Sequence, residues 1–360
     1  MEKMVIDNFN SVFKNTNTFI TGHTGFKGSW LALWLSSLHS NVSGFSLKPK
    51  KDSHWNDLDI SIVNNNIGDI RNYNLVEDCL LNANPEIVFH LAAQPLVRES
   101  YETPIETWDT NVIGTANLLQ ACRKLNNLKA IIVVTSDKCY ENTEINKGYK
   151  ENDPLGGHDP YSSSKAAVEL LVSSFRRSYF SDDNSPRLVT ARAGNVVGGG
   201  DWSENRLIPD CVKAWSKNKK VIIRNPNSTR PWQHVLEAIM GYIILAANLK
   251  QNKNLNGEAF NFGPNTKKNY KVIECVRKMK KYWPSINWKV KKTQTFFESS
   301  LLKLNSNKAS KILKWKCVLN FEETIKMTTI WYRNFYQKNK KKISINQIKE
   351  YIKIYNKRSN

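Results

Sequence analysis

Short apolar runs alternate with helical patterns through the first half of the chain, and this alternation constrains the fold more than any other feature. The runs are continuously apolar and lack the polar alternation of a half-exposed strand. Strands of that kind are buried on both faces, as in a parallel sheet covered by crossover helices. The predicted strands are 18–21, 41–46, 87–90, 130–135 and 187–193, and the predicted helices include 29–38, 110–124 and 162–177. The sequence therefore predicts an α/β fold.

The second half of the chain has a different character. Glycine, proline, asparagine and tryptophan recur from Gly198 to Trp232, and a helical pattern follows at 269–282. We also expect a long surface loop at 142–159 and a turn at 261–264. The expected domains are a parallel-sheet domain of residues 1–194, to which 234–264 return, and a smaller mixed domain of 195–233 and 265–360.

The tail predicts one amphipathic helix that begins near Ser344. Ser344 and Gln347 fit a capping box, and Ile348 and Tyr351 fall at helical spacing. We expect this helix to dock on the body or on a second subunit in preference to a membrane surface.

Composition excludes several classes of protein. With 360 residues, 40% hydrophobic and 24% charged, the chain lies in the globular range. Its longest mostly apolar stretch, Ala238 to Leu249, is shorter than the roughly 20 residues that span a bilayer. The N-terminus lacks an apolar leader, and the six cysteines form no Cys-x-x-Cys pair. These features predict a cytoplasmic protein with reduced thiols and no metal site.

Positive charge is concentrated in the second half. Residues 1–180 carry 17 Lys and Arg against 20 Asp and Glu, whereas 181–360 carry 36 against 12. A basic half can indicate a nucleic acid or a phosphate-bearing substrate. Lysines on solvated helix faces, such as those within 278–281, explain most of the excess, so we expect no nucleic-acid partner.

A glycine-rich turn lies directly after the first predicted strand and directly before a helix. It reads Thr-Gly-His-Thr-Gly-Phe-Lys-Gly from Thr21 to Gly28. Three glycines at this spacing let the backbone approach a pyrophosphate at the helix N-terminus, so the turn predicts a dinucleotide and a Rossmann-type doubly wound sheet. The second strand ends at Ser46 where a carboxylate usually binds the ribose, and the nearby Lys48 leaves a 2′-phosphate open.

Two further segments carry chemistry. Tyr161 and Lys165 are four residues apart at the start of a helix, hence on one face, and we expect the ammonium to favour the phenolate. Ser136, Asp137 and Lys138 follow a predicted strand at the edge where parallel sheets place ligands. The serine can complete a hydroxyl–phenol–ammonium set, and the pair after it adds an acid and an amine.

These motifs resemble the extended short-chain dehydrogenase/reductase family, specifically its nucleotide-sugar 4,6-dehydratases. The segments Thr21–Gly28, 135–141 and 230–235 are most similar to the group that acts on CDP-glucose. The resemblance implies NAD as cofactor, oxidation at C4, elimination across C5 and C6, and return of the hydride to C6. It also implies a homodimer or homotetramer in deoxysugar biosynthesis, such as that of lipopolysaccharide O-antigen. Asn305 departs from the family, which usually has Asp there.

The expected site follows from these segments and from the resemblance. The catalytic residues are Ser136, Asp137, Lys138, Tyr161 and Lys165. The cofactor-binding residues are Gly22, Thr24, Gly25, Phe26, Lys27, Gly28, Ser46, Asp69, Ile70, Leu91, Ala92, Ala93, Gln94, Asn111, Tyr161 and Lys165. The substrate-binding residues are Arg230, which we rank first because a guanidinium matches a diphosphate, followed by Arg192, Asn195, Arg206, Arg224 and His234.

Some alternatives stay open at this point. Arg192 equally fits a salt bridge at a strand end, and Trp202 and Trp232 fit the core better than stacking on a base. The expected protonation of Asp137 and Lys138, a neutral pair or an ion pair, is not decided by the sequence. Competing functions are another nucleotide-sugar dehydratase or 4-epimerase of this fold and, more remotely, a non-catalytic basic protein that binds nucleotides or nucleic acid.

Overall fold

The computed structural model describes residues 4–144, 147–204, 206–223, 225–264, 269–290, 302–337 and 342–359. Its centre is a seven-stranded sheet in the order β11-β6-β5-β4-β1-β2-β3, and every neighbouring pair in it is parallel. The strands are β1 (Asn17–Thr21), β2 (Asn41–Ser46), β3 (Asn64–Ile67), β4 (Ile87–His90), β5 (Ala130–Val134), β6 (Arg187–Ala193) and β11 (Ala259–Phe262). The strand order reverses between β1 and β4, which is where a sheet of this kind opens a crevice for ligands. The predicted doubly wound α/β fold is confirmed.

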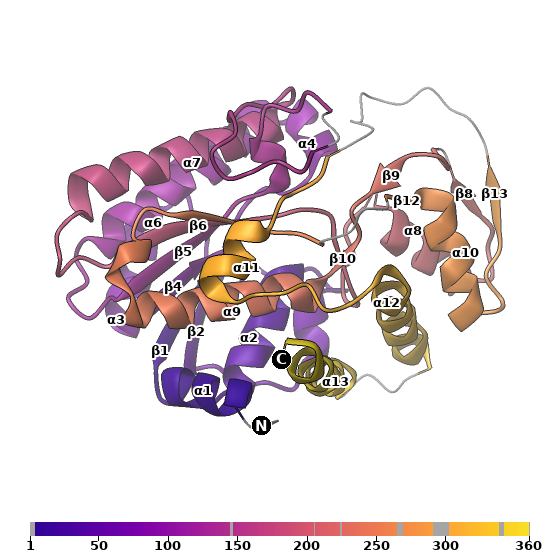
Figure 1. Cartoon of the computed structure of the whole chain (residues 1–360), viewed down its shortest axis with the longest axis horizontal. Coiled ribbons are helices and arrows are strands. Elements are labelled where there is room, and N and C mark those ends of the chain that lie inside the picture. The colour runs from indigo at the N-terminus through magenta and orange to yellow at the C-terminus, as the bar shows by residue number, and fades with distance from the viewer. Residues whose placement is uncertain are drawn as a thin grey trace.

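Helices cover both faces of the sheet (Figure 1). Successive strand residues point to opposite faces, so Ile132 packs in one core and Ile131 and Val133 in the other. One face carries α1 (Met4–Phe13), α2 (Phe26–Ser37), α9 (Val235–Gln251) and α11 (Asn307–Leu313). The other carries α3 (Tyr73–Ala83), α6 (Gly114–Cys122) and α7 (Pro160–Tyr179). Burial on both faces explains why the strands are continuously apolar.

Shorter elements connect these layers. Between β4 and α6 the chain forms α4 (Val97–Glu102), α5 (Pro104–Trp108) and one π-helical turn, η2 (Asp109–Ile113). The 3₁₀ turns are η1 (His54–Asp57), η3 (Asp137–Cys139) and η4 (Lys253–Leu255). The described part of 142–159 is a loop, as predicted.

A smaller lobe lies beside the sheet, at the right of Figure 1. Its strands are β8 (Val221–Ile223), β9 (Thr229–Arg230), β12 (Tyr270–Lys271) and β13 (Trp288–Val290), and its helices are α8 (Leu207–Trp215), α10 (Val272–Tyr282) and α12 (Phe321–Tyr336). Two short parallel strands, β7 (Val196–Val197) and β10 (Gln233–His234), lie between the lobe and the sheet. After β10 the chain returns as α9 to cover the sheet.

One predicted turn is wrong in part. Residues 261–264 were expected to form a turn, but Asn261 and Phe262 complete β11, which pairs with β6 at the edge of the sheet. The Gly263-Pro264 pair that follows is typical of a turn, so the sequence pattern did not indicate the four-residue strand before it.

The Oδ1 atom of Asn305, the residue that departs from the resembled family, accepts the backbone N–H of Asn307, a bond that an aspartate oxygen makes equally well.

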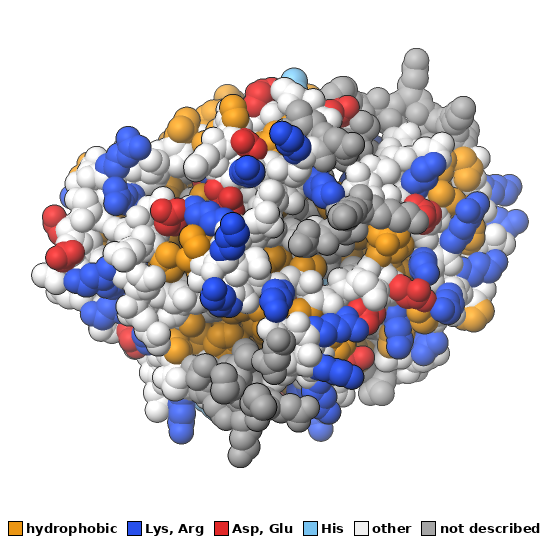
Figure 2. Space-filling model, in the orientation of Figure 1, with side chains coloured by type: hydrophobic (Ala, Val, Ile, Leu, Met, Phe, Trp, Pro, Cys, Tyr) orange, Lys and Arg blue, Asp and Glu red, His pale blue; other side chains and the backbone are white. Residues whose placement is uncertain are grey.

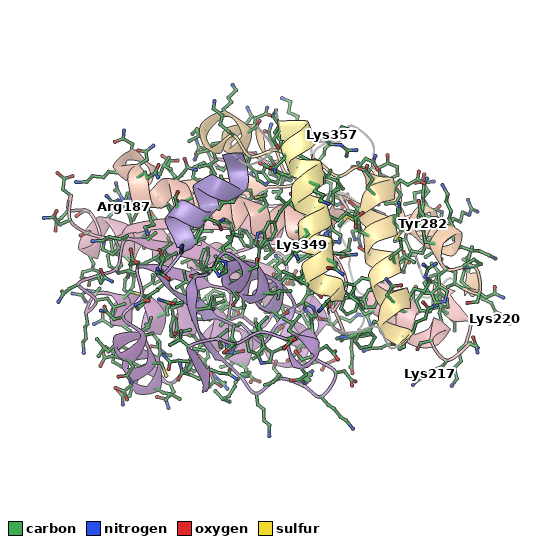
Figure 3. The ribbon with its side chains drawn as sticks, turned by 90° about the horizontal axis from the view of Figure 1, so that it is seen from below. Arg187, Lys217, Lys220, Tyr282, Lys349 and Lys357 are labelled. Atoms are coloured by element: carbon green, nitrogen blue, oxygen red, sulfur yellow. The ribbon has the colours of Figure 1, made fainter. Side chains whose placement is uncertain are left out.

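The C-terminal helix α13 (Ile343–Ser359) docks on the body, where it packs against α12 and α2. Figure 3 shows α12 and α13 side by side, with Lys349 and Lys357 on α13. The predicted capping box is wrong, because Ser344 and Gln347 lie inside the helix and face the protein. The Ser344 hydroxyl is bonded to His54 Nε2 at 2.8 Å and to Trp331 Nε1 at 3.0 Å. In the described residues, no helix is long and apolar enough to cross a membrane.

Candidate active site

The glycine turn lies so close to neighbouring backbone that side chains are excluded at Gly22 and Gly28. Gly22 has φ +73°, and a Cβ placed on it would lie 2.8 Å from the Ala92 nitrogen. A Cβ on Gly28 would lie 2.1 Å from the Gly22 oxygen, so helix α2 could not approach the turn this closely with any larger residue. Gly25 precedes α2 and gives no side-chain cap to its first N–H groups. Helix α2 thus begins at Phe26 and Lys27 with N–H groups that no side chain caps, and uncapped N–H groups at a helix start are donors that an anion can use.

The end of β2 provides a hydroxyl in place of a carboxylate. Ser46 is buried, and its Oγ lies 2.7 Å from Thr24 Oγ1 within the glycine turn. Shortly after the next strand, β3, Asp69 accepts hydrogen bonds from the Arg71 guanidinium, which lowers the pKa of that carboxyl. Ile70 beside it is buried against Gly114.

The end of β4 is held by Asn111, which lies in the π-helical turn. Leu91 and Ala92 donate their backbone N–H groups to Thr21 Oγ1 at the end of β1. Asn111 Oδ1 accepts the Gln94 N–H at 2.8 Å, and Asn111 Nδ2 donates to Ser164 Oγ at 2.9 Å. The Asn111 side chain therefore joins the Leu91–Gln94 segment, with Ala93 half-buried in it, to helix α7.

The predicted catalytic residues come together where β5 ends against the start of α7. Asp159 caps α7 by accepting the Ser162 N–H at 2.9 Å, and Pro160 fits the first helical position. This cap sets Tyr161 and Lys165 one turn apart, and both are more than nine-tenths buried. Tyr161 is hydrogen-bonded to Ser136, which begins the turn η3.

One expectation about this group is wrong. Lys165 was expected to favour the Tyr161 phenolate, but burial raises the pKa of Tyr161 to about 12. The Ser136 hydrogen bond and the charge of Arg206 oppose that rise without overcoming it. Burial also lowers the pKa of Lys165 to about 8, against the charge of Glu169. Burial thus dominates both shifts, and neither side chain is a main influence on the pKa of the other, which the spacing alone could not reveal.

Asp137 is a buried acid. Its Oδ1 accepts a hydrogen bond from Ser136 Oγ at 3.0 Å. Its Oδ2 is buried without a partner, and a Cβ on Gly194 would lie 2.6 Å from it. Burial raises the pKa of Asp137, although the charges of Lys138, Lys27 and Arg230 oppose the rise. Within the described part of the chain, no ion pair shorter than 4.0 Å joins Asp137 to Lys138, and burial shifts the Asp137 carboxyl toward its protonated form.

Two of the predicted substrate residues lie near this group. Arg206 makes an ion pair of 3.0 Å with Asp201, and its charge acts on both Tyr161 and Lys27. Arg230 ends β9, and its charge acts on Asp137. Asn195 is half-buried in the bend between β6 and β7. Arg224 lies outside the described residues.

The sequence profile of the family described as GDP-mannose 4,6 dehydratase matches residues 19–328. The chain belongs to this family. It is 43% identical over 337 residues to CDP-glucose 4,6-dehydratase of Salmonella typhimurium (strain LT2), covering 92% of this chain and 93% of that protein. It is 31% identical over 243 residues to dTDP-D-glucose 4,6-dehydratase of Dictyostelium discoideum, covering 63% of this chain and 54% of that protein.

Solved structures show the same fold at lower identity. The epimerase Mth375 of Methanothermobacter thermautotrophicus matches with a TM-score of 0.81 at 21% identity, over 93% of this chain and 96% of that one. DesIV, a dTDP-glucose 4,6-dehydratase of Streptomyces venezuelae solved with NAD bound, matches with a TM-score of 0.74 at 20% identity, over 88% and 97%. This chain thus shares its architecture with an epimerase as well as with a dehydratase, so the fold does not separate the two activities.

Two residues predicted to bind substrate are enclosed by protein in this member of the dehydratase family. Arg192 is 4% exposed and pairs with Glu169 at 2.7 Å, which makes it the strand-end salt bridge that the sequence left open. His234 is fully buried, and its Nδ1 accepts the Leu236 N–H at the start of α9. Trp202 and Trp232 are core residues, the first within an aromatic cluster on α12 and the second bonded to the Tyr270 carbonyl.

Sequence reasoning missed other members of the site. Lys27 was assigned to the cofactor alone, yet its charge acts on Asp137 and Lys165. Tyr242 on α9 is fully buried, and its hydroxyl lies 3.5 Å from Lys27 Nζ. Glu169 lies four residues after Lys165, and this Tyr-x-x-x-Lys-x-x-x-Glu spacing was the signal that could have revealed it.

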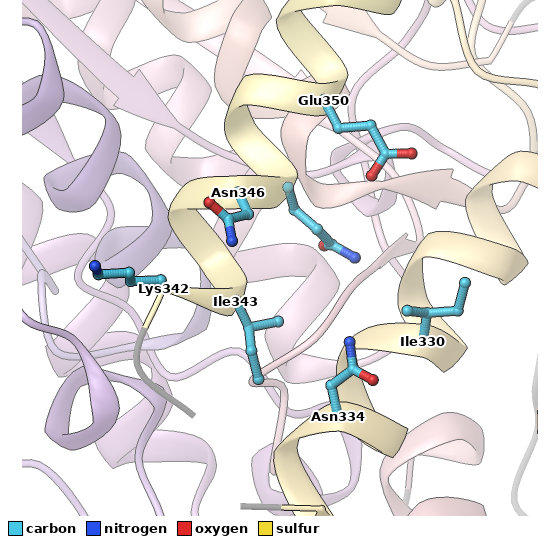
Figure 4. Close-up of a pocket in the computed structure, with 7 residues that line it drawn as sticks. Ile330, Asn334, Lys342, Ile343, Asn346 and Glu350 are labelled. Atoms are coloured by element: carbon cyan, nitrogen blue, oxygen red, sulfur yellow. The ribbon is translucent and has the colours of Figure 1, made fainter. Parts of the chain in front are cut away.

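Two cavities lie apart from the catalytic group. One of about 270 Å³ lies between α12 and α13 (Figure 4) and is lined by Ile330, Asn334, Lys342, Ile343, Asn346, Gln347 and Glu350. The other, of about 240 Å³, is lined by Arg176, Ser181, Asp182, Asp183, Ser185, Arg187, Lys253, Asn254 and Asn256. Neither contains a predicted catalytic, cofactor or substrate residue.

Proposed function

We propose that this protein is an NAD-dependent CDP-glucose 4,6-dehydratase, a hydro-lyase that converts CDP-D-glucose into CDP-4-keto-6-deoxy-D-glucose and water. The observation that carries the proposal is the buried Ser136-Asp137-Lys138 turn beside Tyr161. A dehydrogenase or epimerase needs only the tyrosine, lysine and serine. The additional acid and amine are groups that an elimination uses. The 43% identity to the Salmonella enzyme supports CDP-glucose as the substrate.

The residues around the glycine turn fit NAD. Gly22, Gly25 and the uncapped start of α2 would hold the pyrophosphate, and Ser46 would bond the adenosine ribose. Lys165 would hold the other ribose. When bound, NAD⁺ supplies the hydride acceptor and later the hydride donor of the reaction. Because Ser46 replaces a carboxylate that would repel a 2′-phosphate, discrimination against NADP is expected to be incomplete.

Tyr161 is the base of the oxidation. It takes the proton of the C4 hydroxyl while Ser136, hydrogen-bonded to it, orients that hydroxyl. The phenol has a raised pKa in the protein by itself, so the cationic groups around it, Arg206 and Lys165, must offset burial when the proton moves. The 4-ketone that results makes the C5 proton acidic, because that proton is then α to a carbonyl.

Asp137 and Lys138 carry out the elimination. Lys138 in its neutral form takes the proton from C5, and the protonated Asp137 gives its proton to the C6 hydroxyl, which leaves as water. Burial raises the pKa of Asp137, so the acid holds its proton nearer to neutral pH than an exposed aspartate does. The hydride then returns to C6 while C5 regains a proton from the Lys138 ammonium, and the ketone remains at C4.

Arg230, Arg206 and Asn195 are the groups we assign to the diphosphate and its neighbours. Arg206 is held by Asp201, so its guanidinium is oriented before the substrate arrives. Arg192 pairs with Glu169 and His234 Nδ1 accepts the Leu236 N–H, so we rank these two below the other candidates for the diphosphate.

We also propose that the protein is a cytoplasmic homodimer or homotetramer. Large apolar side chains are exposed on helices beside the site: Ile105 is 74% exposed, Leu170 64% and Ile113 50%. Exposed groups of this kind, close in the fold, fit a surface that a second copy covers. The product class assigns the enzyme to deoxysugar biosynthesis, with lipopolysaccharide O-antigen as the expected destination.

A panel of nucleotide glucoses tests the function. Purified protein with a trace of NAD is incubated with the CDP, dTDP, UDP and GDP forms of glucose, and the products are weighed by mass spectrometry. We expect CDP-glucose to lose one water faster than the others do. If only another nucleotide form of glucose is dehydrated, the substrate carries a different nucleobase. A product of unchanged mass would indicate a 4-epimerase.

A further inference from the structure

Glu169 is a buried carboxylate one helical turn after Lys165. Its side chain is 4% exposed, and its two oxygens accept four hydrogen bonds. Thr135 Oγ1 donates to Oε1 at 2.5 Å, and Thr190 Oγ1 donates to Oε2 at 2.8 Å. Arg192 completes the set through Nε at 2.9 Å and Nη2 at 2.7 Å. Every lone-pair position of the carboxylate is therefore used by a donor, as a buried anion requires.

These donors come from the strands that end at the catalytic group. Thr135 directly precedes Ser136 and follows β5, and Thr190 and Arg192 lie on β6. Glu169 itself lies on α7, on the face that carries Tyr161 and Lys165. One side chain thus joins the two segments that supply all five proposed catalytic residues.

Arg192 extends the connection beyond the strands. Its Nη1 donates to the Tyr140 hydroxyl at 2.8 Å and to the Glu151 carbonyl at 2.9 Å. Tyr140 follows Lys138 by two residues, so the guanidinium also fixes the far end of the turn η3. A buried ion pair is seldom needed for stability, since apolar residues of similar volume often replace one without loss. The Glu169–Arg192 ion pair is hydrogen-bonded to residues of both β6 and the segment after β5, and a role in the site explains its presence here.

We propose that Glu169 and Arg192 are positioning residues of the dehydratase: Glu169 holds the Ser136–Lys138 turn against α7 and supplies a negative charge one helical turn from the Lys165 ammonium, while Arg192, paired with Glu169, partly neutralises that charge. This inference rests on the proposed function, because it assigns the pair to the oxidation at C4. Neither residue touches the reacting atoms. The sequence placed Arg192 among the expected substrate-binding residues. In this proposal Arg192 acts on the same site through Glu169 and does not contact the substrate.

The charges that face Lys165 support this division. Burial lowers the pKa of Lys165, and Glu169 opposes the fall more strongly than Cys139 does. The other titratable groups around it are Tyr161 on the same helix, Lys27 from α2 and His90 from β4. Burial lowers the pKa of His90 to about 3, so His90 is neutral, and Lys27 adds a second positive charge. Glu169 is thus the anion that Lys165 depends on.

Two variants of opposite charge test the proposal through the alkaline limb of the pH profile of the first hydride transfer, measured as NADH formed on mixing, because that step uses Lys165 and does not use Asp137. Lys165 works as an ammonium, so the rate falls as pH rises through its pKa. Glu169→Gln removes the negative charge and leaves Arg192 uncompensated, so the alkaline limb should move to lower pH by about one unit. Arg192→Met leaves Glu169 uncompensated, so the limb should move to higher pH. The double variant removes both charges, and its limb should lie between that of Glu169→Gln and the wild type.

The design keeps the outcomes separate. Structural damage lowers the rate in both single variants without moving the limb in opposite directions, and that result would overturn the proposal. If Glu169→Gln does not fold, the upward shift in Arg192→Met and the intermediate limb of the double variant still decide it. Glu258→Gln is the matched control, because Glu258 pairs with Lys308 at the sheet edge, and its profile should match the wild type. A wild-type protein that does not dehydrate CDP-glucose would contradict the proposed function, whereas shifts that are absent in an active enzyme would contradict the positioning role alone.

Discussion

The sheet lobe and the smaller lobe carry their charges in opposite ways. In the sheet lobe, Arg192 and Glu169 form an ion pair in which both side chains are 4% exposed. In the smaller lobe, Glu322 on α12 binds Lys278 and Lys281 on α10, each at 2.8 Å, with side chains 37% to 65% exposed. Figure 2 shows lysine and arginine side chains gathered over the right of the molecule, where Figure 1 places α10 and β13.

The exposed lysines and arginines that contribute to the net charge of +21 are therefore a different set from the buried charged groups of the candidate site. Exposed charges interact through water and are screened by salt, so many of them together need not define a binding site. The labelled lysines of Figure 3, such as Lys217, Lys220 and Lys357, belong to that exposed group. A few charges buried at the ends of β5 and β6 account for the catalytic proposal, because desolvation changes their proton affinities.

The largest effect is expected at the base of the oxidation. Tyr161→Phe removes the base for the C4 hydroxyl, so no reduced nicotinamide should form when substrate is added. General bases contribute about 100- to 10,000-fold, and we expect a loss in that range, measured by turnover and by absorbance of NADH. A loss below tenfold would show that another group takes this proton.

Lys138→Ala should separate oxidation from elimination. The first hydride transfer stays available, so NADH should appear in a burst, but the C5 proton should not exchange with deuterated solvent. Stopped-flow absorbance and mass spectrometry measure the two steps. Full turnover in this variant would reduce Lys138 to a structural residue at a strand end.

Asp137→Asn should have a smaller and more selective effect. The amide keeps the size of the carboxyl but supplies no proton to the C6 hydroxyl, so C5 exchange should survive while loss of water slows. The wild type should also lose elimination as pH rises through the raised pKa of Asp137, because the protonated form is the active one. An Asp137→Asn enzyme that exchanges and eliminates at wild-type rates would contradict the role of the acid.

The smallest effect is expected in the smaller lobe. Glu322→Gln breaks an exposed cluster. The lysine hydrogen bonds hold the pKa of Glu322 at about 2, so the cluster is intact at neutral pH and is lost only in strong acid, but exposed ion pairs of this kind contribute little. Turnover at neutral pH should stay within about twofold of the wild type. A large loss of activity would mean that exposed charges do contribute to the site and that the contrast between the lobes is wrong.

How far the sequence could predict the fold depended on burial. β2, β4 and β6 were predicted at their observed bounds because both faces of each are covered, which makes them continuously apolar. β3 was missed because Asn64–Ile67 reads Asn-Asn-Asn-Ile, a polar edge strand whose pairing with β2 is a tertiary effect. β11 was hidden by the Gly-Pro pair that follows it.

The candidate site was predictable in its members more than in its energetics. Motif spacing was enough to select Ser136, Tyr161 and Lys165, which the fold brings together. The direction of the Tyr161 pKa shift was wrong, since it depends on how much water the fold excludes. Arg192 was ambiguous, because a charged residue near the end of a strand can face a substrate or a buried partner, and only the position of Glu169 decides between them.

The central claim is that a hydride removed from C4 returns to C6 of the same sugar. The direct test uses CDP-glucose labelled with deuterium at C4, with NAD in trace amount, and locates the label by NMR spectroscopy of the product. The account predicts a 4-keto-6-deoxy sugar that carries the deuterium in its C6 methyl group, with no net consumption of NAD. Deuterium that accumulates in NADH would indicate a simple dehydrogenase. Deuterium found at C4 of a sugar that keeps its C6 hydroxyl would indicate an epimerase.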